Sequence, residues 1–243
     1  MKRMVAVAFL TLSSALFAQS GIAVGTILPA QLNSALKSNR SRPGQVVSVR
    51  IMQDVPLPGG SKIRAGSRIV GHVIAAQRAE SGSAAKITVR FDTLVAGKRR
   101  IPVNTNLRAL ASMMEVNEAQ VPQTGPDRGT TEFDWNTIQI GGEAAYHGSV
   151  ITNGFRTVGK SVPPTGAMVQ LMATRNSCRS DLDNNDREQA TWIFGSNACG
   201  LYGFSNLTLA HAGRTDPTGE IVFTSAKGNI NIRAGSGMLL RVD

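Results

Sequence analysis

The order of apolar and polar residues along the chain predicts short β-strands over most of its length. Between residues 24 and 106, apolar residues alternate with polar ones, and Gly or Pro interrupts the alternation every few residues. A period of two places alternate side chains on one face, so each segment is expected to form a half-buried strand. The clearest segments are 46–51, 63–73, 86–91 and 101–106. Their hairpin spacing is typical of a barrel or a sandwich.

The alternation returns in the C-terminal half of the chain, after a stretch without periodicity. Residues 115–131 gather proline and glycine and predict a linker, whereas 107–118 fit both a helix and a strand. Further strands are expected at 135–140, 168–174, 191–194, 201–204, 206–211, 221–225, 229–233 and 238–242. We therefore predict an all-β fold with little helix. A short-stranded barrel or sandwich would span 19–114, and a disulfide-stapled β extension would span 132–243.

One pentapeptide occurs twice and predicts two equivalent turns. The sequence Ile-Arg-Ala-Gly-Ser spans 63–67 and recurs unchanged at 232–236, with an apolar strand after each copy. A glycine between two strands permits the positive φ that a tight turn requires. We interpret Gly66 and Gly235 as structural turn residues at two corners of one barrel, which the last strand would then close. The alternative is coincidence in a glycine-rich chain.

The first residues have the pattern of a secretory signal peptide. Lys2 and Arg3 precede an apolar stretch of 14 residues, 4–17, and short residues follow it. A membrane-spanning helix needs about 20 apolar residues, and no later segment approaches that length. Cleavage is expected after Ala18, which makes 1–18 the signal peptide, with Ser20 as the alternative. No cysteine lies nearby to carry a lipid, so we expect a periplasmic, secreted or outer-membrane-associated protein without a transmembrane segment.

Export determines how the two cysteines are interpreted. Cys178 and Cys199 enclose a polar stretch, and in an oxidising compartment they are expected to form a disulfide. Such a bridge contributes about 3 kcal/mol, mostly by restricting the unfolded chain. A cysteine nucleophile would need a neighbouring base, and a zinc site would need more ligands than the sequence places together.

The charge balance restricts the expected partners. Lys and Arg number 26 against 16 Asp and Glu, which gives a formal net charge of +10. Nucleic acid is the usual partner of so basic a chain, but export argues against it. The compact basic run 98–100 lies between a glycine and Ile-Pro, and we interpret it as a solvated hairpin tip. The expected partners are envelope proteins or anionic cell-wall and outer-membrane material, and the chain is compatible with an oligomer.

Four segments carry a resemblance to a known family. They are 25–32 (GTILPAQL), 42–47 (RPGQVV), 63–71 (IRAGSRIVG) and 229–240 (NINIRAGSGMLL). Their turns and strand starts resemble the C-terminal β-barrel of the TrbI-like conjugation family, the scaffold subunit of type IV secretion cores. The resemblance covers 24–106 and 228–243, and 133–225 has no counterpart in the family pattern. The resemblance implies a barrel and a role in envelope assembly. It implies no catalytic activity, because turn and strand motifs indicate fold more than activity.

The sequence offers few residues for metal or catalytic chemistry. Asp181, Asp183 and Asn185 alternate as in a calcium loop, but the glycine and the final glutamate of that loop are missing. The alternative is a solvated turn. The three histidines lie on separate predicted strands and lack the spacing of a metal or nucleophile motif. No cofactor is expected.

Aromatic residues provide the remaining candidate site. Trp135, Trp192 and Tyr202 would form a platform for stacking on sugars if they share a face, and core packing is the alternative. Taken together, the pattern predicts a non-catalytic, exported envelope protein with a scaffolding or protein-assembly role. A carbohydrate- or cell-wall-binding module is the alternative, and an exported hydrolase is the third class.

Overall fold

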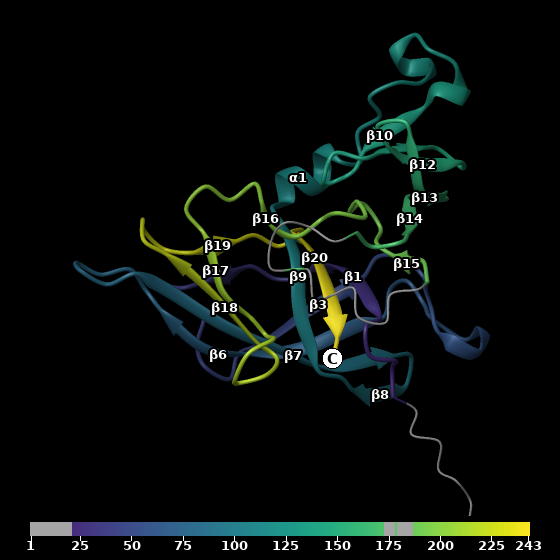
Figure 1. The fold of residues 1–243 in the computed structure, drawn as a ribbon. Helices are drawn as coiled ribbons and strands as arrows, with labels where there is room; N and C mark the ends of the chain where they lie inside the picture. Colours follow the sequence, from purple (N-terminus) through teal and green to yellow (C-terminus); the bar gives the residue numbers. More distant parts are fainter. Residues whose placement is uncertain (1–20, 173–177, 179–186) are drawn as a thin grey trace, which may run out of the picture.

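The computed structural model describes residues 21–172, 178 and 187–243, and within them the chain is mostly β, as predicted. Strands account for 48% of the chain and helices for 7%, which confirms an all-β fold. Two sheets build the molecule: a ten-stranded, nearly closed barrel-like sheet and a six-stranded small sheet that projects from it (Figure 1). The prediction that residues 1–18 form a signal peptide lies outside the described residues.

The barrel-like sheet has the strand order β16-β9-β20-β1-β3-β6-β7-β18-β17, and β8 pairs with β7. All neighbours are antiparallel except β16 and β9, which are parallel. The strands are β1 (Ile27–Leu32), β3 (Val46–Ile51), β6 (Arg68–Gln77), β7 (Ala85–Ala96), β8 (Arg99–Pro102), β9 (Thr105–Ala111), β16 (Gly200–Tyr202), β17 (Thr208–Ala212), β18 (Glu220–Ser225) and β20 (Gly237–Val242). Short pairs join β2 (Leu36–Lys37) to β19 (Asn231–Ile232) and β4 (Val55–Pro56) to β5 (Lys62–Ile63).

The last strand of the chain is a central strand of the barrel-like sheet and not an edge strand. β20 pairs with β1 on one side and with β9 on the other, so that Leu240 stands opposite Leu28 and also opposite Leu107. The strands β16, β17 and β18 belong to the same sheet. The barrel therefore takes up residues 200–243 as well as the N-terminal half, and the small sheet is an insertion between β9 and β16.

The two copies of the pentapeptide form turns with the same hydrogen bonds. Gly66 N donates to Ile51 O and Gly235 N donates to Leu32 O, each at 2.8 Å. Ser67 O accepts from Ile51 N and Ser236 O accepts from Leu32 N, again at 2.8 Å. The two glycines have φ of 87° and 86°. Each copy therefore turns the chain at the end of one barrel strand and begins the strand that pairs with it.

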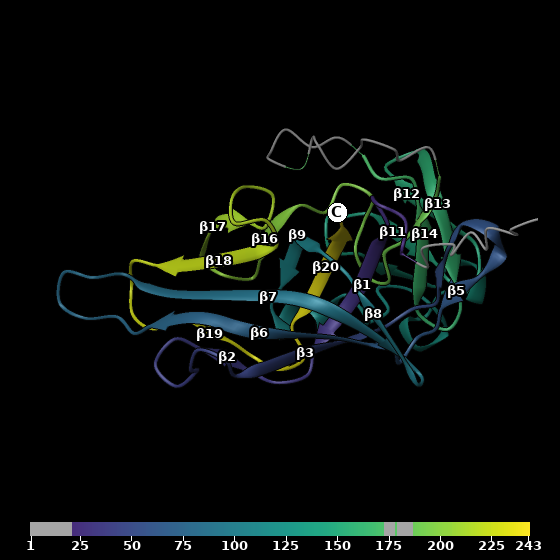
Figure 2. The same ribbon diagram turned by 90° about the horizontal axis from the view of Figure 1, so that it is seen from below.

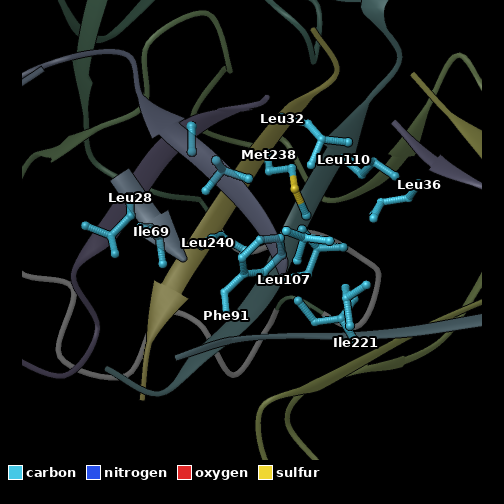
Figure 3. Packing of buried hydrophobic residues seen from close by; sticks show 14 of the residues in the cluster. Leu28, Leu32, Leu36, Ile69, Phe91, Leu107, Leu110, Ile221, Met238 and Leu240 are labelled. Carbon is cyan, nitrogen blue, oxygen red and sulfur yellow. The ribbon is translucent and has the colours of Figure 1, made fainter. Parts of the chain in front are cut away.

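Apolar side chains from both ends of the chain fill the barrel. Figure 3 shows side chains from β1, β6, β7, β9, β18 and β20 converging on one another. Phe91, Leu110 and Leu240 are all 0% exposed. Such close packing makes the barrel interior a filled core.

The small sheet is an antiparallel meander in chain order. Its strands are β10 (Asn136–Ile138), β11 (Ala144–Tyr146), β12 (Val150–Asn153), β13 (Arg156–Val162), β14 (Gly166–Val169) and β15 (Gln189–Ala190). The helix α1 (Met113–Glu118) lies between β9 and the small sheet in the chain. It begins after Ser112, whose side chain caps the helix by accepting from Glu115 N at 3.3 Å. The ambiguous stretch 107–118 thus begins as strand and ends as helix. Three short 3-10 helices are η1 (Pro58–Gly60), η2 (Pro126–Arg128) and η3 (Glu132–Asp134).

The prediction of a strand at 191–194 is wrong. These residues form a buried turn in which Trp192 has φ of 58° and Phe194 makes an isolated parallel bridge to Ile140. Both rings are buried, at 2% and 0% exposed. The apolar run is continuous because the whole turn is enclosed, so hydrophobicity alone does not distinguish it from a strand.

Candidate functional site

A buried glutamine fixes the small sheet to the barrel. Gln53, just after β3, accepts from Ala167 N at 3.0 Å and from Trp192 N at 2.8 Å through its Oε1. Its Nε2 donates to Ala167 O at 2.9 Å. One amide side chain therefore satisfies backbone groups of β14 and of the 191–194 turn, which positions the turn beside the sheet.

A second buried polar cluster supports the segment that leads back to the barrel. Arg108 on β9 is 0% exposed and donates to Ala198 O at 3.0 Å and to Ser196 O at 3.3 Å. Glu143 is also 0% exposed, and it accepts from Ser196 N at 2.7 Å and from the Ser196 hydroxyl. Ser196 is fully buried. The buried carboxylate and Arg108 therefore hold the 196–198 segment through hydrogen bonds.

A pocket of about 300 Å³ lies beside the 191–194 turn. The loop after α1, the start of β10 and the 191–194 turn form its walls, together with residues near the β13–β14 connection. The amide and aromatic side chains of its lining are Gln120, Trp135, Asn136, Gln139, His147 and Trp192. None of the residues that line the pocket is Asp, Glu, Lys or Arg. The pocket is therefore suited to a neutral ligand with apolar and hydrogen-bonding parts.

Trp135 forms one wall of the pocket and is held on one face by a histidine. Its ring is stacked on His147 with a centroid separation of 4.2 Å and an interplanar angle of 17°. His147 N also donates to Trp135 O at 2.8 Å, as the pairing of β10 with β11 requires. Gly125 lies against the same indole, because a Cβ there would come within 3.2 Å of Trp135 Cγ.

Two amide side chains at the pocket keep acceptors without a partner among the described residues. Gln139 is 4% exposed and donates from Nε2 to Trp192 O at 3.4 Å, whereas its Oε1 accepts no hydrogen bond there. Asn136 Oδ1 is likewise buried and without a donor in the described part of the chain. A buried acceptor without a donor is costly, so these two oxygens reduce the stability of this side of the pocket.

The structure does not assemble the predicted stacking platform. Trp135 and Trp192 both line the pocket, but Trp192 is 2% exposed and forms part of the core. Tyr202 lies on β16 beside β9, outside the pocket, where its hydroxyl accepts from Cys199 N at 3.0 Å. The three rings therefore share no exposed face, and Trp135 is the less buried of the two that line the pocket.

Other predicted site residues have mixed outcomes. Cys178 and Cys199 form the predicted disulfide, and Gly66 and Gly235 have the positive φ that was expected of them. The weak calcium candidates Asp181, Asp183 and Asn185 lie outside the described residues. Within residues 21–172, 178 and 187–243, no three His, Cys, Asp or Glu side chains are grouped to hold a metal ion.

The histidines are dispersed, as their sequence positions indicate. His72 Nδ1 lies 3.5 Å from Asp92 Oδ2 on the outer face of the barrel, and His211 contacts Thr215 and Pro217 O. His147 is the stacking partner of Trp135. Sequence reasoning missed Gln53, Arg108 and Glu143, which have no local motif because their partners lie 53 or more positions away.

Two phenylalanines of the small-sheet region are exposed to solvent. Phe155, at the tip of the β12–β13 hairpin, is 111% exposed, and Phe133, in η3, is 94% exposed. By contrast, Phe91, Phe194 and Phe223 are 0% exposed. Aromatic residues are enriched in protein–protein interfaces, so these two exposed rings are candidates for contact with a partner.

Comparisons with models of protein families and with curated proteins found no match for this chain. In the part of the chain that the structure describes, no helix is long and apolar enough to cross a membrane. The Cys178–Cys199 disulfide is consistent with a non-cytoplasmic protein, since oxidising compartments preserve such bonds.

Proposed function

We propose that this chain is a non-catalytic, exported assembly protein of the cell envelope, in which the barrel is the rigid base and the small sheet binds a protein partner. The observation that carries the proposal is the exposure of Phe133 and Phe155, at 94% and 111%, on the part that projects from the barrel (Figure 1). Aromatic residues of this kind supply much of the binding energy when a partner buries them. The signal-like N-terminus and the TrbI-like strand and turn motifs support the same function.

The pocket beside Trp135 favours a second function, the binding of a neutral cell-wall carbohydrate. Its uncharged lining, which includes the amide side chains of Gln120, Asn136 and Gln139, matches the hydroxyl groups of a sugar. Trp135 contributes an indole edge and His147 covers one of its faces. This geometry is weaker than a free stacking platform, so the assembly role is the first proposal.

Site-specific photo-crosslinking in the envelope tests the first proposal. A photoreactive phenylalanine analogue replaces Phe133 or Phe155, and the same analogue at Val24, which is 56% exposed, is the matched control. We expect a discrete protein adduct from positions 133 and 155 and none from position 24. The adduct at 155 should disappear when Phe133→Ser is combined with it, if both rings contact the same partner.

Two other results would contradict the assembly role. Equal adducts at all three positions, or none at any, would overturn the assembly role for this surface. In that case, glycan binding that Trp135→Ala abolishes and Phe155→Ser leaves intact would establish the carbohydrate function in its place.

A further inference from the structure

The positive charge of this chain is concentrated in one part of the barrel. Residues 21–111 contain fourteen Lys and Arg against three Asp and Glu, whereas 112–188 contain six against ten. The net charge of +10 is therefore distributed unevenly: the N-terminal half of the barrel is basic and the small-sheet region is acidic. A separation of this kind produces a field that orients the molecule toward a charged surface.

Three arginines of this half form a row across the outer face of the barrel. The strand register places Arg50 of β3 directly opposite Arg68 of β6. Arg68 stands opposite Val95 of β7, and Val95 stands opposite Arg100 of β8. Residues directly opposite in an antiparallel pair project from the same face, so Arg50, Arg68 and Arg100 point outward together. All three are exposed.

The row is not neutralised within the described part of the chain. No Asp or Glu there forms an ion pair with Arg50, Arg68 or Arg100. Two acidic residues of this half are engaged elsewhere: Asp54 lies 2.5 Å from Lys62 Nζ, and Asp92 lies beside His72. Arg50 instead donates to Gln31 Oε1 at 3.3 Å. Like charges directly opposite each other destabilise a sheet, so a bound anion would reduce the repulsion between Arg50 and Arg68.

Exposed aliphatic side chains share the face with the arginines. On β3, Val46 and Arg50 both lie on the outward side, and Val46 is 60% exposed. On β6, Ile74 lies on the same side as Arg68 and is 39% exposed. Seen from below in Figure 2, β3, β6 and β7 run side by side, and Figure 1 places β6, β7 and β8 on the side of the molecule away from the small sheet.

We propose that this face of the barrel binds the surface of a membrane rich in anionic phospholipids, through the phosphates of the headgroups. Guanidinium groups match phosphate oxygens in two-point hydrogen bonds, and a row of three across adjacent strands fits a plane of phosphates better than a single small anion. The exposed aliphatic residues would enter the headgroup layer beside them. The inference is independent of the protein partner proposed for the small sheet.

Vesicle sedimentation tests the proposal with the chain from residue 19 onward, which follows the expected cleavage site. The probes are vesicles of phosphatidylcholine alone and vesicles with phosphatidylglycerol added. The row variant carries Arg50→Gln, Arg68→Gln and Arg100→Gln. The matched control carries Arg128→Gln, Arg156→Gln and Lys227→Gln, which removes the same charge from other exposed positions. Thermal melting of both variants verifies that they fold.

We expect binding to the phosphatidylglycerol vesicles only, and a decrease with salt. Each cation near an anionic surface changes partitioning about fivefold, so the row variant should bind about 100-fold more weakly. The control should retain most of the binding. Equal losses in the two variants would overturn the assignment of the row, because net charge alone would then explain the effect. Row-dependent retention by soluble polyphosphate without vesicle binding would overturn the membrane as the occupant.

Discussion

Gly66 and Gly235 have the same backbone conformation in different surroundings. A Cβ on Gly66 would meet no atom within 4 Å, whereas a Cβ on Gly235 would lie 3.1 Å from Met113 Cγ. We expect Gly66→Ala to cost about 1 kcal/mol, the strain of a left-handed residue, and Gly235→Ala to cost more. Valine should cost more than alanine at both turns. Urea unfolding measures each difference, and equal costs for the two alanine variants would contradict the Met113 contact.

The carboxylate of Asp54 makes the stability of the first of these turns depend on pH. Its carboxylate is 2.5 Å from Lys62 Nζ and accepts from Ala65 N at 2.8 Å, and these contacts lower the pKa of Asp54 below its usual value of 3.8. A carboxylate with a lowered pKa stabilises the fold above pH 3.8 and loses this contribution as the pH falls through its folded pKa.

We therefore expect Asp54→Asn to be less stable than the unmodified chain at pH 7, by less than about 1 kcal/mol because the pair is partly exposed. The difference should vanish at acid pH. Denaturant titrations at pH 7 and near pH 2.5 provide the comparison. A difference that persists unchanged at the lower pH would show that the side chain acts by shape rather than by charge.

At the scale of elements, Gln53 links the barrel to the small sheet. Gln53→Ala would leave Ala167 N and Trp192 N without their acceptor, inside a region from which water is excluded. We expect a loss of about 2–5 kcal/mol, since each orphaned buried group costs about 1–3 kcal/mol. Amide hydrogen exchange should accelerate at Ala167 and Trp192 before the barrel strands respond. Gln45→Ala, at a partly exposed position, is the control and should change little.

The position of β20 between β1 and β9 makes the C-terminus essential for the barrel. Removal of residues 229–243 would open two strand edges and would expose the side of the core that Met238 and Leu240 cover. We expect the truncated chain to lose cooperative unfolding, because the apolar area exposed exceeds the marginal stability of a domain. Circular dichroism during heating tests this, and an unchanged melting temperature would show that the barrel closes without β20.

Elements with a local pattern were predictable from the sequence, and elements defined by distant partners were not. Residues 46–51 alternate apolar and polar side chains and form β3, and the repeated pentapeptide identified the turns that precede β6 and β20. The 191–194 turn has the same apolar composition as a strand. Its turn conformation depends on distant partners such as Gln53, which the local sequence does not indicate. The arginine row depends on the register of β3, β6, β7 and β8, which the basic run 98–100 alone does not predict.

At the scale of the whole molecule, the two proposed surfaces belong to different parts, the barrel and the small-sheet region. The arginine row belongs to strands of the barrel, with Arg50 three residues before the Gln53 anchor, while Phe133 and Phe155 belong to the part that projects from the barrel (Figure 1). The acidic composition of 112–188 would turn that part away from an anionic surface. A barrel that rests on a membrane would therefore leave the two phenylalanines free for a protein partner.

Hydroxyl-radical footprinting on vesicles tests this orientation, because oxidation of a side chain reports its access to water. With phosphatidylglycerol vesicles, we expect oxidation at Val46 and Ile74 to fall, since the headgroup layer would cover that face. Oxidation at Phe155 and Phe133 should remain as it is in the free protein. Phosphatidylcholine vesicles are the control and should protect neither set. If Phe155 becomes protected while Ile74 stays accessible, the exposed phenylalanines insert into the membrane, and the orientation argued from the charge separation is reversed.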